Sequence, residues 1–179
     1  MLLLRLLSLL CLLFLSQVSS GQEESASAQP EAIPETCPVT RPPDDPFLPP
    51  APYPTDLHEN DFWLGTEKLW TGLHYPEVWK WAPHQPGHEQ EVQPLTEKVF
   101  WWRVGYDYHA DIPRPKLKVT GRRLDGPAPP LMVMRATNAY TGTWSMLTGV
   151  YAPAPGCWEI TGDYQGDKLS FIVWVEPAK

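Results

Sequence analysis

Two histidines and the acidic residues beside them are the side chains best suited to hold a metal ion. His84 and His88 are four residues apart, and Glu89 and Glu91 follow them closely. Imidazole and carboxylate groups together are a common ligand set for divalent metals. Prolines and a glycine around these histidines break any helix, so the spacing does not bring the two rings to one face. Solvated loop histidines explain the pattern more simply, and we expect no metal and no other cofactor.

Asp107 and Asp111 form a carboxylate pair that would suit acid–base hydrolysis. In a chain with 21 acidic residues, however, some such pair arises by chance. The sequence contains no Gly-x-Ser-x-Gly motif and no glycine-rich loop of the kind that binds phosphate. We therefore expect a protein that is not an enzyme, with a small secreted hydrolase as one alternative.

Aromatic side chains offer a different kind of chemistry, because the flat face of an indole ring can stack on a sugar. The chain has nine tryptophans, and each can bury a large apolar area in a core. A carbohydrate-binding module with exposed tryptophans is therefore a second alternative, although packing beneath a long loop at residues 82–97 explains the same residues. The candidate platform residues are Trp79, Trp81, Trp101, Tyr106 and Tyr108.

Trp101 and Trp102 are neighbours in a predicted strand, so their side chains point to opposite faces. Trp102 shares its face with Phe100, Val104 and Tyr106, which predicts that Trp102 belongs to the core. Trp101 would then face outward, where a proline-rich segment of the same chain is the expected cover.

The first twenty residues read as a secretory signal, with one basic residue, an apolar run and small residues before the expected cleavage site. Its removal takes Cys11 away and leaves Cys37 and Cys157. An exported chain with an even number of cysteines most simply forms a disulfide. We therefore expect a secreted or periplasmic protein with a Cys37–Cys157 bond and no transmembrane span after the signal.

The segments that follow differ sharply in composition. Residues 21–36 are small and polar, which indicates a flexible leader, whereas residues 37–54 are dense in proline and favour polyproline II. The disulfide should hold this proline-rich arm against the domain. The apolar side chains of Phe47, Leu48 and Tyr53 should then pack on the domain surface. A proline-rich ligand for the aromatic groove of a partner is the alternative reading.

Residues 55–179 carry short β-type runs between glycines and prolines, which predicts an all-β antiparallel sandwich or barrel. The clearest signal is a final hairpin, where apolar residues alternate on both sides of a Gln165-Gly166-Asp167 turn. The formal charge of −7 argues against nucleic acid as a partner. The predicted strands are 62–64, 68–71, 78–81, 98–106, 116–120, 131–136, 146–151, 157–164 and 168–175.

Residues 156–162 followed by 169–173 resemble the final hairpin of bacterial immunoglobulin-like domains. With residues 37–40, 100–103, 121–125 and 127–131, they resemble a group of uncharacterised, exported bacterial proteins over most of residues 37–175. The resemblance implies an immunoglobulin-like β-sandwich and no particular activity. We accordingly expect a structural or interaction role at the cell envelope, with an envelope protein or a polysaccharide as partner.

Overall fold

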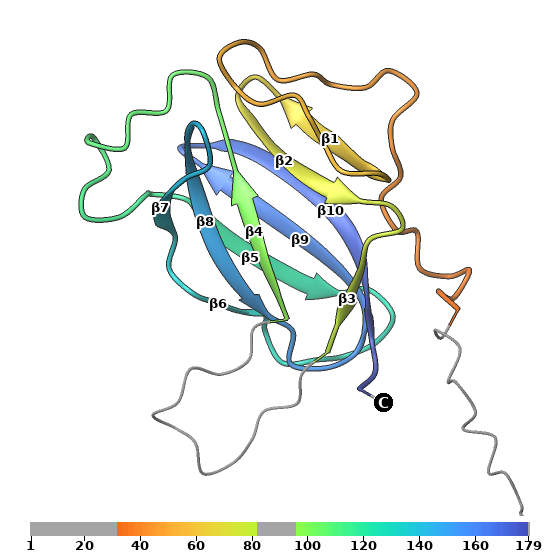
Figure 1. Cartoon of the computed structure of the whole chain (residues 1–179). Coiled ribbons are helices and arrows are strands. Elements are labelled where there is room, and N and C mark those ends of the chain that lie inside the picture. The colour runs from red at the N-terminus through yellow and green to blue at the C-terminus, as the bar shows by residue number, and fades with distance from the viewer. Residues whose placement is uncertain (1–31, 82–95, 179) are drawn as a thin grey trace, which may run out of the picture. The chain divides into compact units, whose positions relative to one another are not determined.

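A computed structural model describes residues 32–81 and 96–178 of the chain (Figure 1). Within these residues there are strands and no helix, and thus no helix long and apolar enough to cross a membrane. The expected signal at residues 1–20, most of the expected leader, and the loop with His84 and His88 lie outside the described residues.

Three sheets make up the described fold. One pairs β1 with β2, one has the order β3-β10-β9-β5, and one has the order β4-β8-β6 with β7 also paired to β8. β3 runs parallel to β10, and the other pairs are antiparallel. The strands are β1 (Asp61–Thr66), β2 (Leu69–His74), β3 (Val78–Lys80), β4 (Glu97–Trp101), β5 (Lys118–Arg123), β6 (Met132–Val133), β7 (Thr137–Tyr140), β8 (Trp144–Tyr151), β9 (Gly156–Tyr164) and β10 (Asp167–Glu176).

The sheets containing β8 and β9 contribute to one shared apolar core. Met146 and Val150 of β8 and Trp158, Ile160 and Phe171 of β9 and β10 all belong to it, and each is at most 1% exposed. This arrangement confirms the predicted all-β fold and agrees with a β-sandwich.

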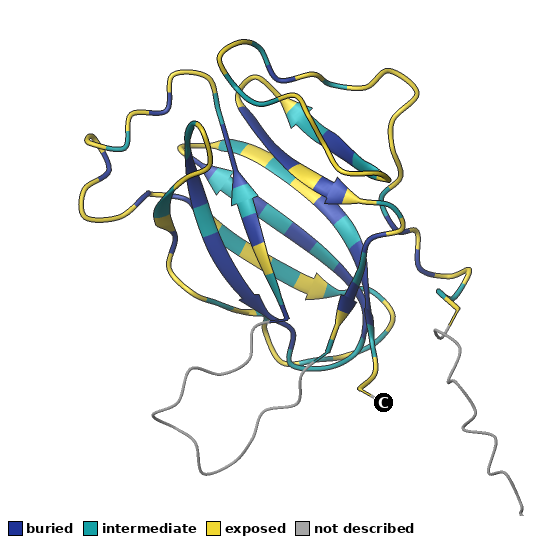
Figure 2. Ribbon diagram, in the orientation of Figure 1, coloured by how far each residue is buried: buried dark blue, intermediate teal, exposed yellow. Residues whose placement is uncertain are grey.

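The predicted final hairpin is present as β9 and β10, which pair from Asp167 with Tyr164 to Val175 with Gly156. Its two-residue turn places Gln165 at φ 57° and Gly166 at φ 93°. Positive φ at both central residues is what the favoured hairpin turn requires, and glycine adopts it without steric cost. Buried and more exposed residues alternate along these strands (Figure 2).

The expected orientation of the two adjacent tryptophans is wrong. Trp101 is fully buried in the shared core, whereas Trp102 is 7% exposed and belongs to a separate aromatic cluster with Trp63 and Trp70. Gly162 of β9 explains the choice, because a Cβ atom there would lie 2.4 Å from the Trp101 ring. The missing side chain leaves the space that the Trp101 indole occupies.

Some strand boundaries also differ from the expected ones. The predicted strand 98–106 ends at Trp101, after which Trp102 makes a single bridge to Trp70. The predicted strand 131–136 shortens to Met132–Val133, and β7 at Thr137–Tyr140 was not predicted.

The Cys37–Cys157 disulfide is confirmed, with the two Cα atoms 5.5 Å apart. It lies with Val39 and Trp174 in a small buried cluster on the outer side of β9 and β10. Thr40, which follows Val39 in the chain, donates its backbone N–H to the Ile172 carbonyl of β10 at 3.0 Å. Its hydroxyl accepts the Ile172 backbone N–H at 2.7 Å. The chain after Cys37 therefore runs against the outer face of this hairpin.

Further along the same segment, Phe47 and Tyr53 pack on Trp70, with ring centroids 5.6 and 4.9 Å away. The Tyr53 hydroxyl also donates to the Arg103 carbonyl at 2.6 Å. Leu48, expected as a third apolar side chain packed on the domain, is instead 67% exposed. Adjacent side chains of an extended segment do not share one face, so Phe47 and Leu48 do not contact the same surface.

Candidate functional site

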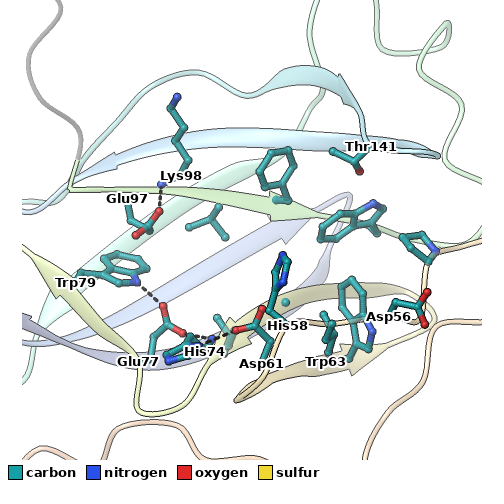
Figure 3. A pocket seen from close by; sticks show the side chains of 17 residues that line it. Asp56, His58, Asp61, Trp63, His74, Glu77, Trp79, Glu97, Lys98 and Thr141 are labelled. Atoms are coloured by element: carbon teal, nitrogen blue, oxygen red, sulfur yellow. Dashed lines mark hydrogen bonds and ion pairs between the residues drawn. The ribbon is translucent and has the colours of Figure 1, made fainter.

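A cleft of about 570 Å³ lies between the β1–β2 hairpin, the turn from β2 to β3, and β4 (Figure 3). Its polar lining is mostly acidic, with Lys98 as the one Lys or Arg among the described lining residues. The carboxylates and imidazoles that line it are Asp56, His58, Asp61, His74, Glu77 and Glu97.

Glu77 is the most deeply placed of these acids and is 8% exposed. One carboxyl oxygen accepts the His74 backbone N–H at 2.6 Å, and the other accepts the Trp79 indole N–H at 2.5 Å. Burial raises the pKa of Glu77, and the nearby charge of Glu97 adds to the increase, while the two hydrogen bonds oppose it. Glu77 thus fixes the turn between β2 and β3 and presents a buried carboxyl beside the cleft.

Asp61 and His74 form a second polar pair on the same wall. They are directly opposite each other in the β1–β2 register, and the Asp61 carboxylate lies 2.8 Å from His74 Nδ1. Figure 3 shows this pair next to Glu77. Cross-strand pairing therefore brings together two groups that are 13 residues apart in the sequence.

The opposite wall comes from β4. Glu97 is half-buried, and one of its carboxylate oxygens accepts the Lys98 backbone N–H at 2.7 Å. Phe100, two positions beyond Lys98, is also half-buried and stacks on Trp102 with ring centroids 5.8 Å apart. This wall combines one carboxylate, one exposed ammonium group and an aromatic surface.

Aromatic rings form much of the interior of the cleft. Trp63 meets Trp102 edge to face, with centroids 5.3 Å apart, and Trp79 lies at the other end with its indole nitrogen bonded to Glu77. These three indoles are 2–7% exposed, so their outer edges rather than whole faces reach the cleft. Phe100 offers the larger accessible ring surface.

The aromatic residues proposed from sequence do not form one exposed platform. Trp79, Trp101 and Tyr106 are buried at 2%, 0% and 9% exposure, because they pack into the shared core. Trp81 and Tyr108 are half-buried, with Trp81 bonded to the Ala152 carbonyl and Tyr108 stacked on Trp144 at 3.8 Å. Of the five, Trp79 alone lines the cleft.

The two acids proposed from the sequence, Asp107 and Asp111, do not form a pair and have different roles. Asp107 is exposed and accepts the His109 backbone N–H at 2.9 Å. Asp111 is 2% exposed, and one of its oxygens accepts both the Tyr164 hydroxyl and the Lys116 backbone N–H. Asp111 thus holds a loop in place, and the hydroxyl it engages has a pKa raised to about 12 by burial and by this bond.

Among the residues that the structure describes, no group of three histidine, cysteine or acidic side chains is placed to hold a metal ion. The arrangement in the cleft suits a ligand that donates hydrogen bonds, because ionised carboxylates only accept them. Aromatic and aliphatic edges beside those acceptors would contact the apolar parts of the same ligand.

Sequence reasoning missed Glu77, Asp61 and the role of His74. Recognition of β1 and β2 as a hairpin would have placed Asp61 opposite His74, but the strands were predicted too short to reach either residue. Glu77 carries no local signal, because its burial depends on the packing of Trp79.

The chain was compared with protein-family models, with curated proteins and with solved structures, and no match was found in any of the three.

Proposed function

We propose that this chain is an exported, non-enzymatic β-sandwich protein of immunoglobulin-like type that binds a carbohydrate of the cell envelope in the cleft described above. The observation that carries the proposal is the joint lining of one cleft by carboxylate acceptors and aromatic rings. Sugars present hydroxyl donors around an apolar ring face, so both kinds of side chain find a partner on one ligand.

The charge of the cleft narrows the class of sugar. Three partly or fully exposed acids, Asp56, Asp61 and Glu97, face one ammonium group, Lys98. An acidic sugar would be repelled by this surface, whereas neutral sugars and amino sugars would not. The proposed ligand is therefore a polysaccharide of neutral or amino sugars.

Export is supported by the disulfide. Cys37 and Cys157 close a loop across 120 positions, and such bonds persist in oxidising compartments outside the cytoplasm. A role at the cell envelope agrees with this chemistry and with the predicted secretory signal.

The binding test uses isothermal titration with a chitosan oligomer, a neutral glucan oligomer and polygalacturonate. Tryptophan fluorescence provides a second readout, because Trp63 and Trp102 line the cleft. We expect one of the first two ligands to bind and polygalacturonate not to bind. Absence of binding to every neutral and amino glycan tested would contradict the proposal.

A matched set of variants locates the binding site. Asp61→Asn combined with Glu97→Gln removes one acceptor charge from each wall, and each lost charged hydrogen bond costs about 1.5–3 kcal/mol. Affinity should therefore fall by roughly a hundred-fold or more. Glu159→Gln is the control, because Glu159 lies on β9 and bonds to Arg122 away from the cleft.

Glycan hydrolysis is a second candidate function, favoured by one specific observation. Glu77 is a buried carboxyl with a raised pKa, and the charge of Glu97 acts on it from the opposite wall. A carboxyl group of raised pKa that faces a second carboxyl group is the arrangement that glycosidases use. Both Glu77 oxygens already accept hydrogen bonds, however, which favours a structural role for this residue.

The two functions separate in one experiment. If the protein only binds, a glycan incubated with it stays intact by mass spectrometry, and Glu97→Gln changes affinity alone. Release of shorter products that stops in Glu97→Gln would establish hydrolysis and overturn the non-enzymatic proposal.

A further inference from the structure

A second pocket, of about 540 Å³, has the opposite charge from the cleft. Its lining comes from the segment that leads into β5 and from the connection between β6 and β7. Four basic residues, Arg114, Lys116, Lys118 and Arg135, stand around it, and no acidic side chain is among its described lining residues. All four are exposed.

The floor of this pocket is apolar and firmly placed. Leu117 and Ala136 are 7% and 3% exposed and belong to the shared core, and Pro115 is also buried. The buried Asp111 accepts the Lys116 backbone N–H at 3.1 Å and lies 3.6 Å from its ammonium nitrogen. The pocket therefore has a rigid base, and exposed basic side chains stand around its rim.

Lys116 is paired with Asp111, but the other three basic groups of the pocket differ from the two arginines at the end of β5. Arg122 and Arg123 bond to Glu159 and Asp125 at 2.6 Å, so their charges are largely neutralised. Across the described parts of the chain, no ion pair joins Arg114, Lys118 or Arg135 to a carboxylate. In a chain of net charge −7, this gathers uncompensated positive charge at one concave place.

A concave surface with charge of one sign concentrates oppositely charged ligands. Guanidinium groups match the oxygens of phosphate in pairs of parallel hydrogen bonds, and ammonium groups add charge. The apolar floor of Leu117, Pro115 and Ala136 would contact the organic group that the phosphate esterifies. We propose that this pocket binds a phosphate ester through Arg114 and Arg135, with Lys118 contributing charge.

A phosphate ester of this kind can come from a dissolved metabolite or from a phospholipid headgroup. Two probes distinguish these sources: glycerol 3-phosphate, measured by isothermal titration, and vesicles of phosphatidylglycerol, measured by co-sedimentation beside vesicles of phosphatidylcholine. Glycerol is the uncharged control ligand. Binding should weaken as the salt concentration rises, because the attraction is electrostatic.

The key variant is Arg114→Gln combined with Arg135→Gln, since both residues are exposed and their replacement should leave the fold intact. Losing two charged donors should weaken binding roughly a hundred-fold. Arg122→Gln on β5 is the matched control and should bind as the wild type does, because its charge is already paired.

Binding of glycerol 3-phosphate that is lost in the double variant would support the pocket and place its ligand in solution. Binding only to phosphatidylglycerol vesicles, again lost in the double variant, would support it and place the ligand in a membrane. No binding to either probe, or binding that survives in the double variant, would overturn the proposal. These outcomes do not affect the test of glycan binding in the cleft, because that test uses variants of Asp61 and Glu97.

Discussion

The packing of Trp101 on Gly162 gives the most direct test of the core arrangement. A Cβ atom at Gly162 would lie 2.4, 2.6 and 2.9 Å from three atoms of the six-membered ring of Trp101. Ordinary contacts between such atoms are about 3.5–4.0 Å, so Gly162→Ala forces the indole to move by roughly 1 Å. The ring is held by Phe171, 5.8 Å away, and by a hydrogen bond from its nitrogen to the Thr148 hydroxyl at 3.1 Å.

The cost of this change can be worked from its parts. Overpacking of a dense core costs about 1–3 kcal/mol, and a buried donor that loses its partner costs about 1–3 kcal/mol more. Alanine regains roughly 0.5–1 kcal/mol over glycine in a strand, because its backbone loses less entropy on folding. Gly162→Ala should therefore lower the free energy of unfolding by between about 1 and 5 kcal/mol.

Urea unfolding followed by circular dichroism measures this difference, with two further variants as controls. Gly126→Ala should change stability by less than about 0.5 kcal/mol, because the nearest atom to its Cβ is 3.9 Å away. Combining Gly162→Ala with Trp101→Phe removes the clashing ring atoms. The double variant should therefore lose less free energy of unfolding than the two single variants lose in total. A Gly162→Ala protein as stable as the wild type, or strictly additive effects, would refute the proposed packing.

Two other perturbations test the disulfide and the buried acid. Cys37→Ser should lower the melting temperature by several degrees, and reductant should destabilise the wild type but leave the variant unchanged; a variant equally sensitive to reductant would contradict a stabilising disulfide. Because burial raises the folded-state pKa of Glu77, its contribution to stability is greatest below pH 4.5 and declines as the pH rises through the folded-state value. In Glu77→Gln, the free energy of unfolding should therefore fall less steeply above pH 4.5 than in the wild type. Urea unfolding across the acidic to neutral range measures this dependence. The same pH dependence in both proteins would show that Glu77 does not cause the fall.

The features that sequence predicted well are those set by local patterns. The β9–β10 hairpin has buried residues that alternate along most of both strands and a glycine in a turn that needs positive φ, so neighbouring residues alone define it. The disulfide followed from counting: once the expected signal removes Cys11, Cys37 and Cys157 have no other partner in the chain.

The orientation of Trp101 and Trp102 required information that no local pattern holds. Both faces of β4 carry large apolar residues, so alternation identifies two faces without saying which one meets the shared core. The choice depends on Gly162, which belongs to a strand of the opposite sheet and supplies the space for one indole. Trp102 could then be buried only by a different surface, that of Trp63 and Trp70.

The cleft was less predictable than the core for a similar reason. Its acidic and imidazole groups come from the segment before β1, from β1, from the end of β2 and the turn after it, and from β4, and they share no motif. Asp61 and His74 meet through strand register, and the buried Glu77 accepts a hydrogen bond from the indole of Trp79, which packs in the core. Each contact depends on tertiary packing, whereas the acid pair and the aromatic residues chosen from sequence were judged by spacing alone.

The shape of the cleft depends on how the β1–β2 hairpin is held against β4. Trp70 and Trp102 exchange two backbone hydrogen bonds of 2.9 Å, and the Thr71 hydroxyl donates to the Phe100 carbonyl at 2.7 Å. Tyr53 packs on Trp70 from the outside, on a segment that the disulfide anchors at its other end. Phe62, Leu69 and Leu73 of the same hairpin are also buried in the shared core, so the proline-rich segment adds an outer contact to a wall that the core already supports. Through Tyr53 and Trp70, a segment with no regular secondary structure thus contributes to one wall of the proposed binding site, and the disulfide holds the other end of that segment.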